Sequence, residues 1–269
     1  HRAVGRRGGR RKLDLFGLAV RAEAHLRLGK LSRAKSDANK VLRSHPKNTL
    51  ALIVRAQVSL RTGFWADAVE DCDVVLRADP QSGAASAMRG EAKLRLGNFD
   101  EATFDCDRAL DSSPRRKSEV LAIRGESLRL QGSLREAILD CDEVLREKPR
   151  CRKALATRGQ ALLELGKLQA AVADLTKAIE AGRADIADGD DEGLVSRETA
   201  ALFVARAEVE VTSRQFDEAV ADCSEALLLL PADEHSLALA VRAEAQLFAG
   251  RPKECMADCD RALALRPDD

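Results

Sequence analysis

Residues 15–48 read LFGLAVRAEAHLRLGKLSRAKSDANKVLRSHPKN, and the rest of the chain repeats their pattern. A small residue, Ala22, follows Arg21, and Asp37 stands sixteen positions after that arginine. The arginine and the aspartate recur at this separation in seven copies: Arg21 and Asp37, Arg55 and Asp71, Arg89 and Asp105, Arg124 and Asp140, Arg158 and Asp174, Arg206 and Asp222, Arg242 and Asp258. This recurrence predicts that the chain consists of one structural element copied seven times. An internal repeat of this kind determines the architecture of the whole chain.

The spacing of the copies identifies the element. Successive arginines lie 34, 34, 35, 34, 48 and 36 residues apart. A glycine stands eight positions after the arginine in six copies, with Arg214 as the exception. A proline closes six copies: Pro46, Pro80, Pro114, Pro149, Pro231 and Pro267. This pattern resembles the tetratricopeptide repeat, a helix–turn–helix element of about 34 residues with small residues at the helix crossing and a terminal proline. The resemblance covers about residues 14–267, although tyrosine is absent and Trp65 is the only tryptophan.

The resemblance implies an all-α fold, a right-handed α-solenoid of seven helix–turn–helix repeats over residues 13–269. Each turn glycine tolerates a positive φ, and each closing proline prevents the second helix from continuing. The composition agrees, since 33% of the residues are charged and only 3% are aromatic. The repeats are expected at about residues 15–48, 49–82, 83–116, 118–151, 152–183, 200–233 and 236–269, with an acidic insertion at 184–199.

Residues 1–12 (HRAVGRRGGRRK) form a basic segment with five arginines, one lysine, three glycines and no acidic residue. We predict a flexible, solvated lead-in, because no aromatic residue is present for base stacking. The alternative is a tail that contacts RNA, an acidic partner or an import receptor. Over the whole chain 44 basic residues balance 44 acidic ones, so no global charge favours nucleic acid or a membrane. Because the sequence begins at His1 without a methionine, we expect a piece of a longer or processed protein.

The constant interval between arginine and aspartate has a structural explanation. The arginine falls in the middle of the first helix of each pair, and the aspartate falls in the second, antiparallel helix. We therefore predict a structural ladder of arginine–carboxylate hydrogen bonds, within a repeat or across to the next, that sets the register of the stack. A partly buried pair of this kind is costly to break, because the remaining charge is stranded.

Most of the cysteines share one repeat position. Five of the seven directly follow the ladder aspartate: Cys72, Cys106, Cys141, Cys223 and Cys259. Ala38 and Leu175 fill this position in two copies, so we predict buried, reduced thiols in an apolar slot. Helices about 8–10 Å apart lie beyond the Cα separation of about 7 Å that a disulfide allows. Cys255 and Cys259 lie one turn apart without further ligands, so no metal site is predicted. Reduced thiols are typical of a cytoplasmic compartment.

The sequence contains no constellation for catalysis or for cofactor binding. The four histidines are scattered, and none belongs to a motif with a nucleophile and a carboxylate: His1, His25, His45 and His235. Phosphate-binding and dinucleotide-binding fingerprints are absent, and no apolar run approaches the ~20 residues of a membrane span. The sequence therefore predicts a non-enzyme without cofactor, small-molecule substrate or membrane insertion.

The acidic insertion reads ADIADGDDEGLVSRET. Asp188, Asp190 and Glu192 imitate the first half of a calcium-binding loop, but Thr199 stands where that loop needs a bidentate glutamate. We predict an exposed acidic loop that binds no calcium. Because Arg214 replaces the turn glycine shortly after it, this joint is expected to be the least stable of the solenoid.

In the family that the chain resembles, the first helix of each pair lines a concave groove, so the resemblance places the partner site there. The groove-facing residues lie two and five positions from each ladder arginine; those before it are mostly apolar, and those two after it are acidic or amide. The predicted groove residues are Phe16, Ala19, Glu23, Leu50, Ile53, Gln57, Ala87, Glu91, Glu126, Lys153, Gln160, Glu208 and Glu244. Arg27 and Arg95 are expected to neutralise Glu23 and Glu91 in part. That the glutamates are merely solvated helix surface stays an open alternative.

An apolar trough edged by carboxylates suits an extended or helical protein segment with apolar anchors and neighbouring lysines or arginines. The sequence therefore predicts an interaction scaffold or adaptor, or a subunit of a larger assembly. Relatives that clamp acidic chaperone tails use Lys and Asn in these positions, and here only Lys153 has that charge. The Arg-Gly/Ala-Glu/Gln and Asp-Cys strings resemble J-domain-linked co-chaperones, so a co-chaperone module for unfolded clients or chaperones is the alternative. A further alternative is an RNA-associated scaffold that uses residues 1–12.

Overall fold

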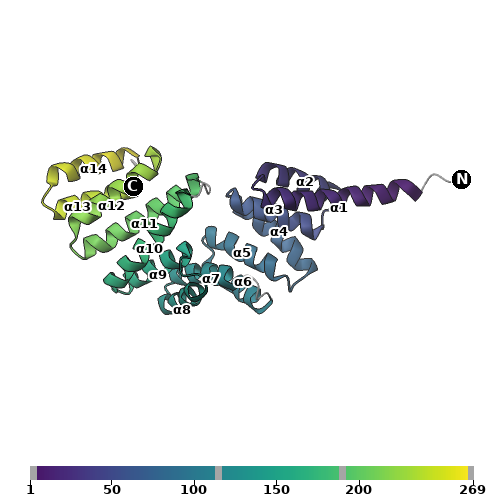
Figure 1. Ribbon diagram of the computed structural model, residues 1–269, viewed down its shortest axis with the longest axis horizontal. Helices are drawn as coiled ribbons and strands as arrows, with labels where there is room; N and C mark the ends of the chain where they lie inside the picture. Colours follow the sequence, from purple (N-terminus) through teal and green to yellow (C-terminus); the bar gives the residue numbers. More distant parts are fainter. Residues whose placement is uncertain (1–4, 113–116, 188–191, 266–269) are drawn as a thin grey trace. The chain divides into compact units, whose positions relative to one another are not determined.

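The computed structural model of the protein describes residues 5–112, 117–187 and 192–265. These residues form α-helices and one short 3₁₀ helix, η2 (Ala232–Glu234), and contain no β-strand (Figure 1). The α-helices are α1 (Gly5–Arg27), α2 (Leu31–Ser44), α3 (Thr49–Arg61), α4 (Trp65–Ala78), α5 (Gly83–Arg95), α6 (Phe99–Ser112), α7 (Lys117–Leu130), α8 (Leu134–Glu147), α9 (Arg152–Glu164), α10 (Leu168–Ala187), α11 (Glu192–Thr212), α12 (Phe216–Leu229), α13 (Ser236–Phe248) and α14 (Pro252–Leu265). The predicted all-α fold is confirmed.

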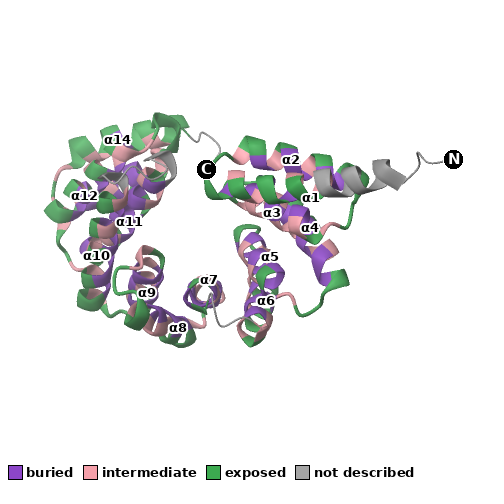
Figure 2. Ribbon diagram, turned by 45° about the vertical axis from the view of Figure 1, so that its right-hand side comes forward, coloured by how far each residue is buried: buried purple, intermediate pink, exposed green. Residues whose placement is uncertain are grey.

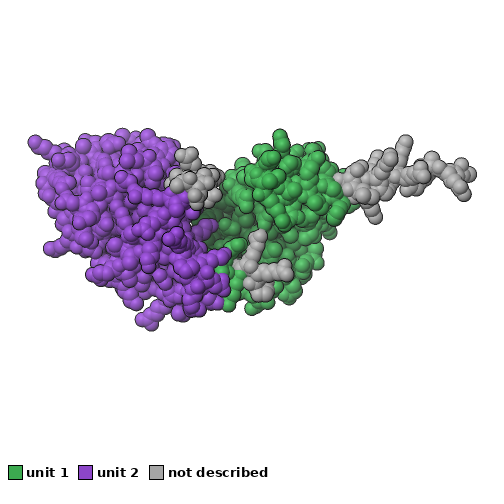
Figure 3. Space-filling model, in the orientation of Figure 1, with its two compact units in different colours: residues 1–131 green, residues 132–269 purple. Residues whose placement is uncertain are grey.

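The chain divides into two compact units, residues 1–131 and residues 132–269 (Figure 3). The first unit holds α1 to α7, and the second holds α8 to α14. Within the units, consecutive helices pack as hairpins: α1 with α2, α3 with α4, α5 with α6, α9 with α10, α11 with α12, and α13 with α14. Each first helix also packs on the second helix of the preceding hairpin, as α3 does on α2 and α13 on α12. This order of contacts is that of an α-solenoid.

The core of each unit is built from the helix faces that meet in the stack. Buried residues follow the facing sides of the helices, and exposed residues follow the outer sides (Figure 2). In the first unit Val41 of α2 and Leu52 of α3 are almost fully buried in one apolar cluster. In the second unit Leu175 of α10 and Phe203 of α11 are likewise almost fully buried in one apolar cluster. Because these contacts join different hairpins, a hairpin acquires its stability from its neighbours.

Small residues after the ladder arginine allow the two helices of a hairpin to cross closely. A Cβ atom added to Gly159 would lie 2.9 Å from the Cγ atom of Leu175. A Cβ atom added to Gly90 would lie 3.2 Å from the Sγ atom of Cys106. The residue after the arginine thus opposes the residue after the aspartate, and a large Leu175 is accommodated because its opposite residue is glycine.

The turns between paired helices require a left-handed backbone. Six turn glycines have φ angles between 69° and 84°: Gly29, Gly63, Gly97, Gly132, Gly166 and Gly250. Arg214, in the turn between α11 and α12, adopts the same conformation with φ 62°, as no other non-glycine among the described residues does. The left-handed region costs a residue with a Cβ atom about 1–2 kcal/mol. The turn geometry is therefore kept at this joint, at the expense of local strain.

The start of α1 differs from the sequence-based expectation. Residues 5–12, which we predicted to be part of a flexible lead-in, continue α1 toward its N-terminus. Arginine and lysine have high helix propensity, and extending an existing helix avoids the cost of nucleation. Residues 1–4 lie outside the described residues.

The acidic insertion also differs from the predicted loop. Helix α10 continues to Ala187 and α11 begins at Glu192, so most of the insertion lengthens these two helices. Thr199 is fully buried, and a Cβ atom on Gly182 would overlap it, so the lengthened helices pack closely on each other. The extra residues have no repeat counterpart, and packing of apolar side chains favours helix over loop. Asp188 and Asp190 of the calcium-like motif lie outside the described residues.

The strained turn gives a stability test. We expect Arg214→Gly to raise the free energy of unfolding by about 0.5–1 kcal/mol, because glycine tolerates the positive φ but loses more chain entropy on folding. Urea-induced unfolding followed by circular dichroism measures the change. The matched control is Gly97→Arg, which places the same residue in a turn that already has glycine and should destabilise the protein. An Arg214→Gly variant no more stable than the wild type would contradict the strain argument.

Candidate partner-binding surface

Hydrogen-bonded arginine–aspartate pairs hold six hairpins in register. In the third hairpin, Arg89 donates from Nε and Nη2 to the two carboxylate oxygens of Asp105, at 2.8 and 2.5 Å. The same bidentate geometry joins five further pairs: Arg21 and Asp37, Arg55 and Asp71, Arg158 and Asp174, Arg206 and Asp222, and Arg242 and Asp258. Arg124 and Asp140 belong to different units, since α7 closes the first and α8 opens the second.

The same guanidinium group also reaches the preceding hairpin, through its third nitrogen. Arg89 donates from Nη1 to Asp73 at 2.6 Å, and Arg242 donates from Nη1 to Ser224 at 3.1 Å. These acceptors stand two positions after each ladder aspartate and were not predicted from the sequence. That position is polar in every copy and is called the link position: Asn39, Asp73, Asp107, Asp142, Thr176, Ser224 and Asp260. Of the two geometries left open by the sequence, the six described ladder pairs use the one within a repeat, and the contact to the preceding hairpin goes to the link residue instead.

Burial makes these pairs strong. Asp105 is completely buried and also forms an ion pair with Lys93, whose Nζ lies 3.0 Å from Oδ2. The hydrogen bonds that Arg89 donates to Asp105, and then to Asp73, raise the pKa of Arg89 above its ordinary value. The hydrogen bond from Arg21 likewise lowers the pKa of Asp37. A buried charge that loses such a partner is left without solvation, so the pairs resist disruption.

The ladder fixes the first helices, which carry all the predicted groove residues. Phe16, Lys153, Glu208 and Glu244 are exposed. Eight more are half-buried: Glu23, Leu50, Ile53, Gln57, Ala87, Glu91, Glu126 and Gln160. Ala19 differs from the prediction, because only 1% of it is exposed and its short side chain does not reach the surface. For the accessible residues, contact with a partner stays a prediction.

Two arginines were expected to neutralise glutamates of this surface. Arg27 does pair with Glu23, with Nη2 2.5 Å from Oε1. Arg95, however, pairs with Glu126 on α7, at 3.2 Å, and not with Glu91 one turn before it on its own helix. Arg95 therefore bridges two first helices, and Glu91 has no ion-pair partner among the described residues.

In the second unit two glutamates lie close enough for their negative charges to repel each other. Glu208 stands two positions after Arg206 on α11, and Glu244 occupies the same position on α13. Although Glu208 as a whole residue is exposed, local desolvation of its carboxyl group, and then the charge of Glu244, raise the pKa of that carboxyl. A cation placed between these carboxylates would lower the energy of both, as a lysine or arginine of a partner could do.

Comparison with known proteins identifies the family of the chain. The family model of the tetratricopeptide repeat matches residues 20–83, 87–150 and 124–186, together more than half of the chain. The chain belongs to the tetratricopeptide repeat family. No curated protein matches the sequence.

Several solved structures share the fold. A chain of the APC/C hetero-tetramer Cut9–Hcn1 superposes with a TM-score of 0.76 at 16% identity, over 95% of this chain and 46% of that one. A tetratricopeptide repeat protein from Parabacteroides merdae gives 0.60 at 21% identity, over 91% and 85%. Pseudomonas aeruginosa pilF gives 0.63 at 16% identity, over 82% and 93%. The chain thus spans less than half the length of the Cut9–Hcn1 match, and these likenesses support the fold alone.

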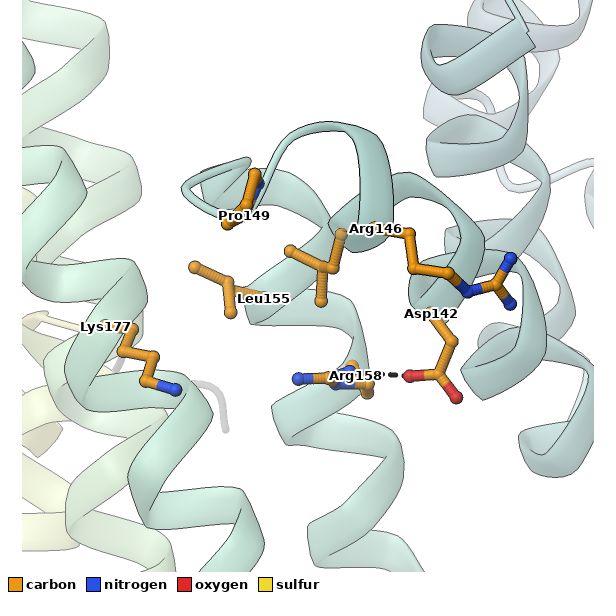
Figure 4. A pocket seen from close by; sticks show the side chains of 7 residues that line it. Asp142, Arg146, Pro149, Leu155, Arg158 and Lys177 are labelled. Carbon is orange, nitrogen blue, oxygen red and sulfur yellow. Dashed lines mark hydrogen bonds and ion pairs between the residues drawn. The ribbon is translucent and has the colours of Figure 1, made fainter.

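Shallow hollows recur between consecutive tetratricopeptide repeats. One of about 420 Å³ in the second unit is bordered by Arg146, Lys177 and the hydrogen-bonded Asp142 and Arg158 (Figure 4). A hollow of about 500 Å³ in the first unit is lined by residues at matching repeat positions: Asn39, Leu42, Arg43, Pro46 and Arg55. Because the same positions line both hollows, we interpret them as products of repeat stacking rather than as dedicated ligand sites.

The cysteine position of the tetratricopeptide repeats is buried in every copy except the last. Cys72, Cys141 and Cys223 are buried, and burial raises the pKa of each thiol to about 12. Such thiols remain protonated at neutral pH and react slowly. Cys259 is exposed, contrary to the prediction, because α14 is not covered by a further helix in the described chain. Among the described residues no group of three or more metal-binding side chains occurs, and none of the helices there combines the length and apolar character of a membrane span.

One buried acid of the ladder region has an unusual environment. Glu210 lies four residues after Arg206, and its Oε2 atom has no hydrogen-bond partner. Burial, and then the charge of Asp222, raise the pKa of Glu210 to about 7. The same repeat position holds other buried polar atoms without a partner, in His25, Ser59 and Gln246. Polar side chains in this position are therefore buried beside the ladder with at least one atom that makes no hydrogen bond.

Removing a buried ladder carboxylate tests the stabilising role of the pairs. We expect Asp105→Ala to lower the free energy of unfolding by about 3–5 kcal/mol, because Arg89 and Lys93 lose their buried counter-charge. The control is Asp107→Ala, which removes an exposed link residue and should cost less than about 1 kcal/mol. Thermal melts measure both variants. A melting temperature of Asp105→Ala equal to that of the wild type would exclude a stabilising ladder.

Glu210 gives a pH-dependent prediction. Its pKa in the folded protein lies above the ordinary value, so it favours folding while protonated, and this contribution is lost as the pH rises through about 7. Between pH 5 and pH 8 we expect the free energy of unfolding of the wild type to fall by up to about 2 kcal/mol more than that of the Glu210→Gln variant. Denaturant unfolding at several pH values measures the difference. Identical pH profiles for the two proteins would show that Glu210 does not titrate in this range.

Proposed function

We propose that the protein is an interaction scaffold whose first helices bind a segment of another protein. The observation that carries the proposal is the row of glutamates without full neutralisation: Glu91 has no ion-pair partner among the described residues, and Glu208 and Glu244 repel each other. Accessible apolar side chains lie on other first helices, Phe16 on α1 and Leu50 on α3. Together they suit a segment with apolar anchors and neighbouring lysines or arginines.

The co-chaperone alternative has weaker support. It rests on the Arg-Gly-Glu and Asp-Cys strings, and these residues have structural tasks in the hairpins. Arg89 and Asp105 hold the ladder, and Gly90 and Cys106 oppose each other where the helices cross. Residues with such tasks carry no information about a client. We therefore prefer a scaffold that is not itself an enzyme, and a reducing cytoplasmic compartment is part of the same proposal.

Charge reversal on the first helices tests the scaffold. The test variants are Glu91→Lys with Glu126→Lys in the first unit, and Glu208→Lys with Glu244→Lys in the second. The matched control is Glu70→Lys with Glu136→Lys, which makes the same charge change on the second helices α4 and α8. Quantitative affinity capture should show partners reduced at least tenfold, about 1.4 kcal/mol, by a test variant but retained by the control. Equal capture by all variants would mean that the glutamates are solvated helix surface.

The RNA alternative gives a different result in the same assay. An RNA scaffold that uses the arginine-rich segment would capture RNA in a strongly salt-dependent manner. Deletion of residues 1–12 would then abolish capture, whereas the glutamate variants would retain it. We expect the opposite pattern, with protein partners that survive the deletion and depend on the glutamates.

A further inference from the structure

The second helix of the first hairpin, α2, carries a basic side that the later second helices lack. Four basic residues of α2 form what we call the basic face: Arg33, Lys35, Lys40 and Arg43. Lys30 and Lys47 flank the helix, and Asp37, the buried ladder residue, is the only acidic residue between them. Every later second helix holds at least two acidic residues besides its ladder aspartate.

The basic face is exposed for a reason that does not depend on where the sequence begins. Helix α4, whose hairpin has a complete hairpin on either side, has nearly the same pattern of exposure as α2. Arg33 is exposed, as is Asp67 at the same repeat position of α4. Arg43 is also exposed, and so is its counterpart Arg77. A preceding hairpin therefore leaves this side of a second helix open to solvent.

Most of the positive charge of the basic face is not neutralised. Its two arginines form no ion pair with any described residue. Lys35 holds its Nζ 4.8 Å from the centroid of the Phe64 ring, a contact that positions the ammonium group and leaves its charge in place. Lys40 lies 3.2 Å from Asp37, but that carboxylate already binds Arg21 at two points. The face therefore keeps an excess of positive charge.

A shallow hollow of about 420 Å³ lies along the basic face, and no acidic residue lines it. The lining residues are Ser32, Lys35, Ser36, Asn39, Lys40 and Arg43. Asn39 accepts a hydrogen bond from Nη1 of Arg55 at Oδ1, which leaves its amide nitrogen as a donor. In every later repeat at least one of the matching positions is acidic, as Glu70 and Asp73 are in the second. The shape of such hollows follows from repeat stacking, whereas this lining is specific to the first hairpin.

We propose that the basic face of α2 binds an acidic segment of a partner protein, at a site separate from the surface of the first helices. Carboxylates of aspartate and glutamate accept hydrogen bonds from the ammonium, guanidinium, amide and hydroxyl groups that line the hollow. The 14 residues of α2 rise over about 21 Å, which an extended segment of about seven residues covers. RNA fits this surface less well, because no aromatic side chain lines the hollow for base stacking.

A labelled peptide tests the proposal. The probe is a fluorescently labelled peptide of alternating glutamate and serine, about ten residues long, so that it can cover α2 when extended. In anisotropy titrations the wild type should bind it saturably with a dissociation constant below about 100 μM at low salt, and more weakly as salt rises. Lys35→Gln with Arg43→Gln should weaken binding about tenfold or more. The matched control is Arg61→Gln with Arg77→Gln, which makes the same charge change in the next hairpin and should leave the affinity unchanged.

A second variant separates binding from stability. Asn39→Asp places a carboxylate in the hollow, at the repeat position that Asp73 holds in the next hairpin. Arg55 can donate to this carboxylate as Arg89 donates to Asp73, so the melting temperature should not fall. The added negative charge should nevertheless weaken binding of the peptide about fivefold or more.

Three results would overturn the proposal. The first is a wild type that does not bind the peptide at concentrations up to about 1 mM. The second is an equal loss of affinity in the test and control variants, since this would indicate attraction by net charge alone. The third is tighter binding of a single-stranded RNA, or of vesicles with anionic lipids, that is lost in the Lys35→Gln with Arg43→Gln variant, because the occupant would then not be a protein segment.

Discussion

The guanidinium group of the ladder arginine is the interaction on which the stack depends. Two of its nitrogens hold an aspartate of the same hairpin, and the third reaches the hairpin before it, as Arg89 does with Asp105 and Asp73. One planar group therefore fixes three helices. Lysine could not replace it, because an ammonium group lacks the fork that binds a carboxylate at two points. The surrounding alanines and valines add burial, whereas the arginine determines the register.

The sequence predicts those features that recur in every copy. The interval from Arg55 to Asp71 and the glycine of six turns were visible because they repeat. The link position was not, because it varies between Asn39, Asp73 and Ser224 and only its polarity is shared. The lengthened helices α10 and α11 were missed for a related reason, since residues found in one copy have no pattern to compare.

The candidate site was predictable in its location but less so in its electrostatics. Offsets from the ladder arginine placed Glu91 and Glu126 on the correct helices, and half-burial of both agrees with an accessible surface. That Arg95 pairs with Glu126 depends on the distance between hairpins, which no local spacing encodes. Ala19 is buried because a single methyl group cannot extend past its larger neighbours. The identity of a partner depends on such details and not on the repeat.

The ladder also affects how such a chain can change in evolution. Each arginine uses only its own hairpin and the one before it, so recombination that duplicates or deletes a whole hairpin leaves every inner aspartate with an arginine. A rearrangement that adds or removes a single helix would instead leave a ladder residue without its partner, such as Asp71, which is 4% exposed. Gene rearrangements that preserve whole hairpins are therefore the ones that such a fold tolerates.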